Sequence, residues 1–322
     1  MKNNFERKLT CTFCNHSHLK LIINFGKVAL AGAFLKLENT KKEKKYNLRF
    51  CFCPKCYAVQ IADIIPPEVL FKKYFYFSSS INTLKKHFDG YARELIDKFK
   101  LDSQSSVLEF GCNDGILLKP FARMGIGNIV GVDPAKNVIS KIKHQKIKTI
   151  NDFFNVGLSK KIKKEFGNFD LIMANNVFAH IKNINNVTEA IKILLKKDGI
   201  FVFEVHYLGK VINELQYDMI YHEHLFYYSI IAATNHFKRH SMKIFDVKSI
   251  KIHSGSMRFY VCNIKGKYSK YKSKRLERYI HNERKNNFHN YKSYHNFSKK
   301  IIKQSNELKF LIQKINSRGE TV

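Results

Sequence analysis

The sequence predicts an α/β fold in which a parallel sheet with crossover helices follows a small metal-binding domain. Over about residues 76–262, short apolar runs alternate with amphipathic helical segments, which is the pattern of parallel strands joined by helices. About residues 1–75 hold five of the seven cysteines and two short strand-like runs. A chain of 322 residues is long enough for two or three domains with a sizeable core.

Composition excludes several broad classes of protein. Hydrophobic residues make up 44% of the chain and aromatic residues 13%, which is too much for a wholly disordered protein. No apolar run approaches the roughly 18 residues that a membrane span needs. The first residues also lack the apolar core of a signal peptide. We therefore expect a soluble, cytoplasmic protein with no membrane partner.

The formal net charge is +31. Such an excess is typical of proteins that bind nucleic acids or anionic membranes, but it also arises from a general enrichment in lysine. Lysine is scattered over every segment and mixed with asparagine. We favour the compositional explanation and do not expect a nucleic-acid partner.

Five apolar runs in the central segment are predicted to be strands, at residues 106–110, 128–132, 148–150, 169–174 and 199–205. Residues 263–322 form a third segment of different character. Its part from 265 to 300 holds 12 Lys and Arg against 2 Glu, interleaved with aromatic residues. Apolar residues at helical spacing then predict a helix over 301–315.

The N-terminal cysteines include two C-x2-C pairs with 38 residues between them. Four thiolates satisfy a tetrahedral zinc ion, and a two-residue gap lets each pair wrap around the metal. The predicted ligands are Cys11, Cys14, Cys53 and Cys56. Because such a site has no open coordination position, we expect it to stabilise the fold rather than to catalyse.

Other arrangements of these thiols are open. Buried free thiols or a redox pair are the alternatives to zinc, and two matched pairs favour zinc. Cys51, His16 or His18 could replace one of the four ligands. Cys112 and Cys262 are interpreted as small core residues.

The first strand of the central domain leads into a glycine-bearing turn, Glu109-Phe-Gly111-Cys-Asn113-Asp-Gly115. The glycines allow the backbone to approach a ligand closely. The turn is not G-x-G-x-x-G, which disfavours a dinucleotide, and no Gly-Lys-Ser/Thr follows as in a phosphate-binding P-loop.

Polar residues also follow the next three strands. Asp133 lies 22 residues after Gly111, where a carboxylate can accept hydrogen bonds from ribose hydroxyls. Asp152 and Phe153 could provide polar and stacking contacts to an adenine, and Asn175 ends the fourth strand. The order of these residues is that of class I methyltransferases with a Rossmann-like sheet, and S-adenosylmethionine is the cofactor that fits best.

Two further motifs gather titratable residues near the expected reactive end of the ligand. Asn176-Val-Phe-Ala-His180 follows the fourth strand, and Tyr221-His-Glu223-His224 follows the fifth. The second motif is not the H-E-x-x-H of zinc proteases. A carboxylate beside an imidazole can fix its tautomer and make it an effective general base.

With these motifs the sequence resembles the sugar C-methyltransferases that act on nucleotide-linked ketodeoxysugars. The matching stretches span about residues 11–258: the two cysteine pairs, Tyr74-Phe-Tyr76-Phe-Ser-Ser, the glycine turn, the two motifs just described and Gly255-Ser-Met-Arg258. The resemblance implies a zinc-binding domain, a domain that binds S-adenosylmethionine and a C-terminal domain of Rossmann-like topology.

The resemblance also implies residue roles. His224 would be the base that removes the C3 proton of a 4-keto sugar, giving an enolate. Tyr76, His180, Tyr221 and Glu223 would line the sugar site and steady the enolate. Arg258 and nearby lysines are candidates to bind the nucleotide diphosphate.

Members of that family continue well past position 322. We therefore expect residues 263–322 to be a basic helical segment that begins a C-terminal domain without completing it, as in a fragment or a truncated chain. We also expect a monomer.

Three alternatives are kept. The acceptor could be an oxygen, a nitrogen or another small molecule instead of a sugar carbon. The zinc pairs and the basic stretch would suit a nucleic-acid binder or an RNA methyltransferase, but no Asn/Asp-Pro-Pro-Tyr/Phe motif follows the fourth strand. Finally, the chain could be an inactive, truncated homologue.

Overall fold

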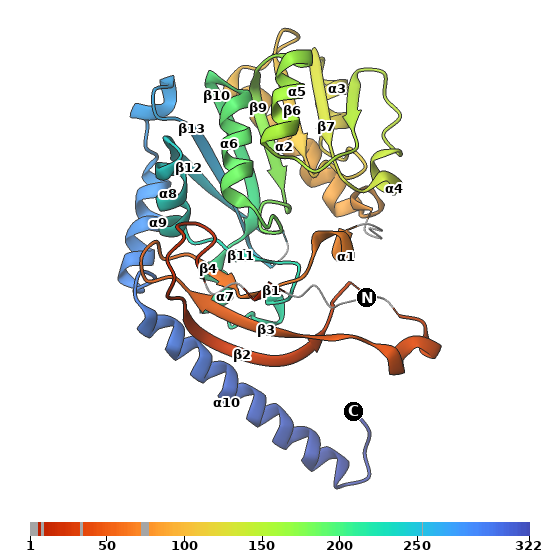
Figure 1. Ribbon diagram of the computed structural model, residues 1–322, viewed down its shortest axis with the longest axis vertical. Helices are drawn as coiled ribbons and strands as arrows, with labels where there is room; N and C mark the ends of the chain where they lie inside the picture. Colours follow the sequence, from red (N-terminus) through yellow and green to blue (C-terminus); the bar gives the residue numbers. More distant parts are fainter. Residues whose placement is uncertain (1–5, 8–9, 33–34, 72–76, 253) are drawn as a thin grey trace.

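The computed structural model describes residues 6–7, 10–32, 35–71, 77–252 and 254–322. Its centre is a seven-stranded sheet in the order β12-β13-β10-β9-β6-β7-β8 (Figure 1). The strands are β6 (Ser106–Phe110), β7 (Asn128–Val132), β8 (Ile147–Ile150), β9 (Phe169–Asn175), β10 (Leu195–His206), β12 (Met242–Ile250) and β13 (Ser256–Asn263).

Neighbouring strands from β6 to β10 pair in parallel, whereas β13 is antiparallel to both β10 and β12. If the seven strands of this sheet are numbered 1 to 7 in chain order, so that β6 is strand 1 and β13 is strand 7, their order is 6-7-5-4-1-2-3. Strand 7 is antiparallel to its two neighbours. This is the class I methyltransferase sheet that the sequence predicts. All five predicted strands are confirmed. The hairpin of β12 and β13 was not among the predicted runs.

Helices cover both faces of the sheet (Figure 1). They include α2 (Asn82–Phe99), α3 (Leu118–Arg123), α5 (Val156–Phe166), α6 (Ile184–Leu194) and α8 (Ile230–Arg239). The short helices α4 (Lys136–Ile139) and α7 (Leu208–Asn213) follow β7 and β10. Alternate side chains of a strand point to opposite faces. Val107 therefore packs with the apolar residues of α2 and α3, while Leu108 packs with those of α5, α6 and α8.

The N-terminal segment forms a second, four-stranded sheet in the order β11-β4-β3-β2. Its strands are β2 (Lys20–Ala29), β3 (Lys45–Phe52), β4 (Val59–Ile61) and β11 (Phe226–Tyr227), and β1 (Glu6–Arg7) pairs separately with β5 (Asp63–Ile64). The short helix α1 (Pro67–Phe71) follows. The edge strand β11 comes from the central domain, so the two domains share one sheet.

The basic C-terminal segment consists of α9 (Lys274–Lys285) and α10 (Tyr291–Asn316). Helix α10 includes the predicted helix and begins ten residues earlier. Its first half is anchored on the N-terminal sheet, where the Tyr291 hydroxyl donates to the Leu21 carbonyl at 2.5 Å. Its second half runs away from the sheets (Figure 1), and Leu308 and Leu311 are about half exposed.

Glu283 attaches α9 to the central domain. This buried carboxylate accepts the backbone N–H groups of Ile230 and Ile231 at 2.7 and 2.8 Å, which are the first residues of α8. The Tyr207 hydroxyl donates to it at 2.9 Å. An acceptor at a helix N-terminus satisfies otherwise unpaired N–H groups. Burial nevertheless raises the pKa of Glu283 to about 7.

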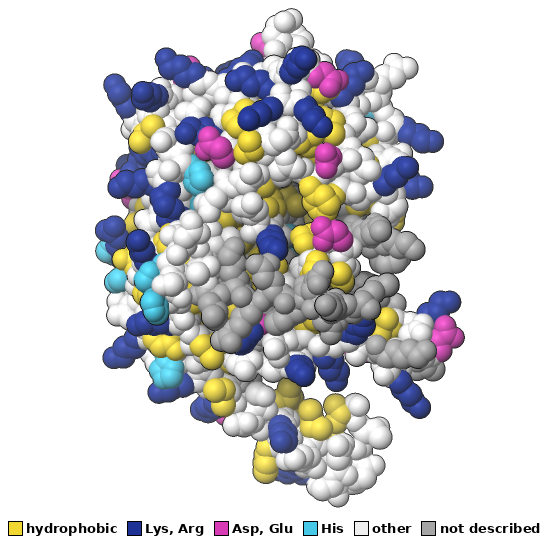
Figure 2. All heavy atoms as spheres, in the orientation of Figure 1, with side chains coloured by type: hydrophobic (Ala, Val, Ile, Leu, Met, Phe, Trp, Pro, Cys, Tyr) yellow, Lys and Arg dark blue, Asp and Glu magenta, His cyan; other side chains and the backbone are white. Residues whose placement is uncertain are grey.

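Lysine and arginine side chains are spread over the visible face of the molecule (Figure 2). Among the described residues, none of the helices is long and apolar enough to cross a membrane.

Candidate active site

The carboxyl ends of β6, β7, β9 and β10 border one cavity of about 800 Å³. It brings together eleven of the predicted cofactor and catalytic residues: Glu109, Gly111, Asn113, Asp133, Asp152, Phe153, Asn175, His180, Tyr221, Glu223 and His224. The convergence follows from topology, because parallel strands end at the same edge of a sheet. Residues of the N-terminal domain, among them Gly32 and Leu70, also line the cavity.

Two predicted residues do not belong to this set. Gly115 is not part of the lining; it has φ +76° and packs against Ile142, to which a Cβ atom would approach within 3.1 Å. Its place is in the turn behind the cavity. Tyr76 lies outside the described residues.

Gly111 lies on the cavity wall, in close contact with Val177. Its φ of +67° disfavours any other residue, and a Cβ atom there would lie 2.5 Å from Cγ2 of Val177. Gly111 donates its N–H to the Val132 carbonyl at 2.7 Å, which fixes the turn on the neighbouring strand.

Glu109 and Asn175 form a buried pair across β6 and β9. The Asn175 amide donates to Oε1 of Glu109 at 2.9 Å. The other oxygens, Oε2 of Glu109 and Oδ1 of Asn175, are buried and have no hydrogen-bond partner among the described residues. Burial raises the pKa of Glu109 to about 8. Two buried oxygens without partners on a cavity wall fit a ligand whose polar groups complete their hydrogen bonds.

Asp133 stands at the end of β7 and is held by the backbone. It accepts the N–H groups of Asn113 and Ala135, each at 2.9 Å. Burial raises its pKa. A carboxylate oxygen accepts more than one hydrogen bond, so Asp133 can also accept from ribose hydroxyls.

The two phenylalanines after β8, Phe153 and Phe154, differ in burial. Phe154 is buried and stacks on Phe110, with ring centroids 4.4 Å apart. Phe153 is 44% exposed at the cavity, so it is the ring that can stack on an adenine. The preceding Asp152 accepts the Phe153 N–H at 2.7 Å.

Tyr221 and His224 are directly joined. The Tyr221 hydroxyl and Nε2 of His224 are 2.9 Å apart, and Nδ1 of His224 lies 3.2 Å from the Met219 carbonyl oxygen. A carbonyl oxygen only accepts, so Nδ1 carries the proton and Nε2 has the lone pair in the neutral ring. The nitrogen turned toward Tyr221 is therefore the basic one.

His180 and Glu223 lie beside this pair. The rings of His180 and His224 are 4.9 Å apart at 69°. Burial lowers the pKa of His180 to about 4, although a hydrogen bond to the Glu223 backbone opposes the shift. Burial raises the pKa of Glu223. Its carboxylate faces Gly32, where a Cβ atom would lie only 2.8 Å from Oε1.

His222, the remaining titratable residue of the Tyr-His-Glu-His motif, has a different partner. It is buried, and its Nε2 lies 3.0 Å from the Asn47 carbonyl oxygen, to which it donates. His224 therefore lines the cavity, whereas His222 contacts the N-terminal domain. Sequence alone gives no signal that separates the two.

The four predicted zinc ligands form one cluster, and their sulfur atoms all lie within 4.8 Å of one another. Two of the separations are 3.5 Å, Cys11 to Cys56, and 3.6 Å, Cys14 to Cys53. Four sulfurs about 2.3 Å from a zinc ion would be roughly 3.8 Å apart, so the cluster fits zinc. Cys51, His16 and His18 do not belong to it.

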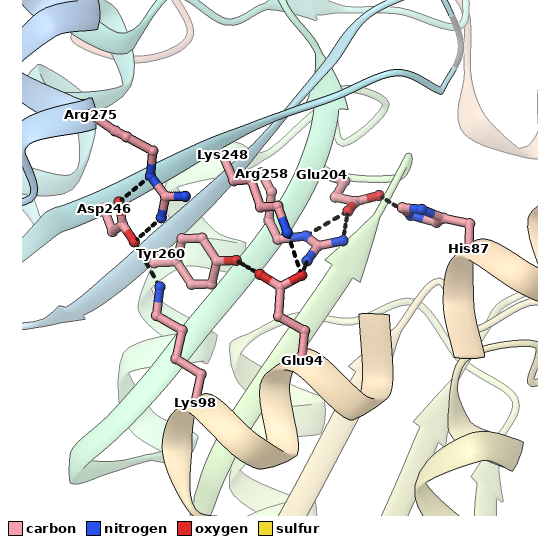
Figure 3. Close-up of polar contacts among 9 residues, drawn as sticks. All are labelled: His87, Glu94, Lys98, Glu204, Asp246, Lys248, Arg258, Tyr260 and Arg275. Carbon is pink, nitrogen blue, oxygen red and sulfur yellow. Dashed lines mark hydrogen bonds and ion pairs between the residues drawn. The ribbon is translucent and has the colours of Figure 1, made fainter. Parts of the chain in front are cut away.

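Arg258 is not available to a diphosphate, contrary to the sequence-based expectation. Its side chain is 1% exposed and pairs with Glu204 and, at 2.9 Å, with Glu94 (Figure 3). The guanidinium also lies 3.3 Å from the centroid of the Tyr91 ring. Arg258 therefore joins β13 to β10 and α2 inside the molecule.

Comparisons with known proteins agree with this architecture. Residues 84–240 match the family model of a methyltransferase domain, residues 11–71 that of a zinc binding domain, and residues 251–322 that of a C-methyltransferase C-terminal domain. Fold, cysteine cluster and matched models together define the class: methyltransferases of the class I fold that use S-adenosylmethionine and carry a structural zinc site.

Among individual relatives, the chain is similar to the C-methyltransferase NovU of Streptomyces niveus. The two are 31% identical over 248 residues, which cover 77% of this chain and 59% of NovU. The chain thus spans less than two thirds of that relative. It is also 30% identical over 98 residues to a ubiquinone biosynthesis O-methyltransferase of Rhodopseudomonas palustris, covering 30% of this chain and 38% of that enzyme.

Among solved structures, a methyltransferase dependent on S-adenosylmethionine from Clostridium acetobutylicum matches with a TM-score of 0.44 and 15% identity. The match covers 56% of this chain and 92% of that one.

Proposed function

We propose that this protein transfers a methyl group from S-adenosylmethionine to C3 of a nucleotide-linked 4-keto-deoxysugar, with His224 as the base. One observation carries the proposal: a single cavity contains both the predicted nucleoside-binding residues and the Tyr221–His224 pair. The similarity to NovU and the match to a C-methyltransferase C-terminal domain support transfer to carbon.

The residues at the strand ends are suited to hold the cofactor. Asp133 would bind the ribose hydroxyls, Phe153 and Asp152 the adenine, and the orphaned oxygens of Glu109 and Asn175 the donors of the amino-acid end. Gly111 keeps the cavity wall free of a side chain. When bound, S-adenosylmethionine supplies an electrophilic methyl group, which a carbon nucleophile takes up with release of S-adenosylhomocysteine.

His224 would create that nucleophile. The C4 carbonyl acidifies the C3–H bond, and Nε2 of His224 takes the proton while the bonding electrons move to form the enolate. The Met219 carbonyl accepts from Nδ1 in the neutral ring and continues to do so in the imidazolium, so Nε2 is the nitrogen that takes up the proton. With Nδ1 protonated and a lone pair on Nε2, His224 is in the protonation state that a general base needs.

The neighbouring residues would stabilise the enolate. In the structure the Tyr221 hydroxyl donates to Nε2 of His224. When it turns from that nitrogen toward the sugar, it frees the lone pair of the base and becomes a donor to the enolate. A buried imidazole with a pKa of about 4 stays neutral at working pH, so His180 lines the proposed sugar site without adding a charge. Donors fixed in a cavity shielded from water are worth more than they are in bulk solvent. Tyr76 is also part of the proposal, on the resemblance alone, because it lies outside the described residues.

Mass spectrometry of a turnover mixture tests the proposal. Wild-type protein with S-adenosylmethionine and a nucleotide-linked 4-keto-6-deoxysugar should give a sugar heavier by one methylene. The His224→Ala variant should give none, while His281→Ala, which changes an exposed histidine on α9, should match wild type. Undiminished methylation by His224→Ala would remove the residue from its role.

A second candidate is methyl transfer to an oxygen. The similarity to ubiquinone biosynthesis O-methyltransferases favours it, although those matches cover about a third of the chain. Fragmentation of the product distinguishes the two, because a methyl group on C3 stays with the carbon skeleton, whereas an O-methyl group leaves as methanol.

A further inference from the structure

The carbonyl oxygen of Met219 accepts two side-chain hydrogen bonds. Nδ1–H of His224 donates to it at 3.2 Å, and the Tyr227 hydroxyl donates to it at 3.1 Å. The Tyr227 oxygen in turn accepts the backbone N–H of Tyr221 at 3.3 Å. One phenol oxygen therefore ties together the residues on both sides of Ile220, in the loop that presents the proposed base.

Tyr227 is itself held rigidly. It belongs to β11, where it pairs with Val59 of β4, and its side chain is 3% exposed. Its ring packs edge-on against Phe50, with centroids 4.9 Å apart at 86°. Burial raises the pKa of its hydroxyl far above the usual value, so the hydroxyl stays protonated and remains a donor.

We propose that Tyr227 is a positioning residue that sets the tautomer of His224; this inference rests on the function proposed above. By fixing the Met219 carbonyl, the Tyr227 hydroxyl keeps an acceptor facing Nδ1 of His224. The imidazole then carries its proton on Nδ1 and keeps the lone pair on Nε2. Tyr227 is not part of the cavity lining, so it acts through His224 and does not touch substrate.

The adjacent Tyr228 provides a matched control. It is equally buried, and its hydroxyl donates to the Phe178 carbonyl at 3.2 Å, outside the 219–224 loop. The substitutions Tyr227→Phe and Tyr228→Phe remove the same atom from neighbouring residues of similar burial. A general loss of stability should therefore appear in both variants, whereas a change at His224 should appear only in the first.

Nuclear magnetic resonance of the full chain with ¹⁵N-labelled histidine measures the tautomer, and the His224 signals are identified by their loss in His224→Ala. Wild type should show the Nδ1–H form. Tyr227→Phe should shift the signals toward a mixture with the Nε2–H form, and Tyr228→Phe should leave them unchanged. A wild-type Nε2–H form, or unchanged signals in folded Tyr227→Phe, would overturn the proposal.

Kinetics provide the second readout. A misplaced base costs on the order of tenfold to a hundredfold in rate, so Tyr227→Phe should lower kcat by that factor and leave the dissociation constant for S-adenosylmethionine unchanged. Equal kcat values for Tyr227→Phe and Tyr228→Phe would contradict a positioning role. The spectra need no sugar, so they test the tautomer even if wild type methylates no ketosugar and the proposed function fails.

Discussion

At the scale of single residues, the cavity depends on positions where a side chain is absent or unpaired. Gly111 has a backbone conformation that favours glycine and no space for a Cβ atom beside Val177. Glu109 and Asn175 present buried oxygens without partners among the described residues. Such features lower the stability of the protein alone and suit a site that a ligand completes.

Replacing Gly111 by alanine should weaken cofactor binding. The new methyl group would lie 2.5 Å from Val177, so either the glycine turn or the segment that follows β9 must shift. We expect the dissociation constant for S-adenosylmethionine, measured by calorimetry, to rise at least about tenfold, or about 1.4 kcal/mol. Gly125→Ala is the control, because Gly125 also has a positive φ but no heavy atom within 4 Å of a Cβ. Equal constants for both variants would contradict this role.

Glu109 should make the cofactor-free protein less stable as pH rises. Its pKa is about 8 in the folded chain against an ordinary value of 4.5, so between these values the folded state binds more protons than the unfolded state. The free energy of unfolding then falls with pH by up to about 1.4 kcal/mol per unit. In Glu109→Gln this contribution should vanish. Urea unfolding of wild type and Glu109→Gln from pH 5 to 8 measures the free energy of unfolding at each pH. The same pH dependence in both proteins would contradict the prediction.

At the scale of elements, the N-terminal domain helps to build the active site. Strand β4 begins three residues after the zinc ligand Cys56 and pairs with β11, which follows His224 by two residues. The Ile61 N–H donates to the Leu225 carbonyl at 3.0 Å, and His222 donates to Asn47 of β3. The cysteine cluster is therefore linked to the 219–224 loop through paired backbone.

Removing zinc should loosen this junction. Folding of such a site is coupled to metal binding, so chelation should speed hydrogen exchange at the Ile61 and Leu225 amides, measured by nuclear magnetic resonance. Cys56→Ser should lose the metal by elemental analysis. Cys51→Ser should keep it, because Cys51 is buried in β3 but lies outside the cluster. Unchanged exchange after complete metal removal would show that the junction stands without zinc.

The buried ion pairs of Arg258 connect α2, β10 and β13 (Figure 3). Removing Arg258 leaves the buried Glu204 with His87 as its remaining ion-pair partner among the described residues, and losing one side of a buried ion pair costs about 3–5 kcal/mol. Arg258→Met should lower the free energy of unfolding in urea by that amount. Lys248→Met removes a partly exposed partner of the same Glu94 and should cost less than about 1 kcal/mol. Similar losses in both variants would contradict this account.

At the scale of the whole molecule, local patterns predict much of the architecture. Apolar runs identify the parallel strands, and residues that follow those strands converge because the strands end at one edge. The pairing of β11 with β4 is different: a two-residue strand has no periodicity, and its partner lies more than 160 residues away. Arg258 is a second case, because its partners Glu94 and Glu204 are distant in sequence and no local pattern predicts that they bury its side chain.

In the proposed reaction, one cavity holds both the cofactor and the base that acts on the sugar. The most direct test is deuterium exchange at C3 of a nucleotide-linked 4-keto-6-deoxysugar, monitored by proton nuclear magnetic resonance in heavy water. S-adenosylhomocysteine replaces the methyl donor, so that no methyl transfer occurs. We predict that wild type removes the C3 proton signal and that His224→Ala leaves it intact. Exchange at the wild-type rate in His224→Ala, or none in wild type, would contradict the account.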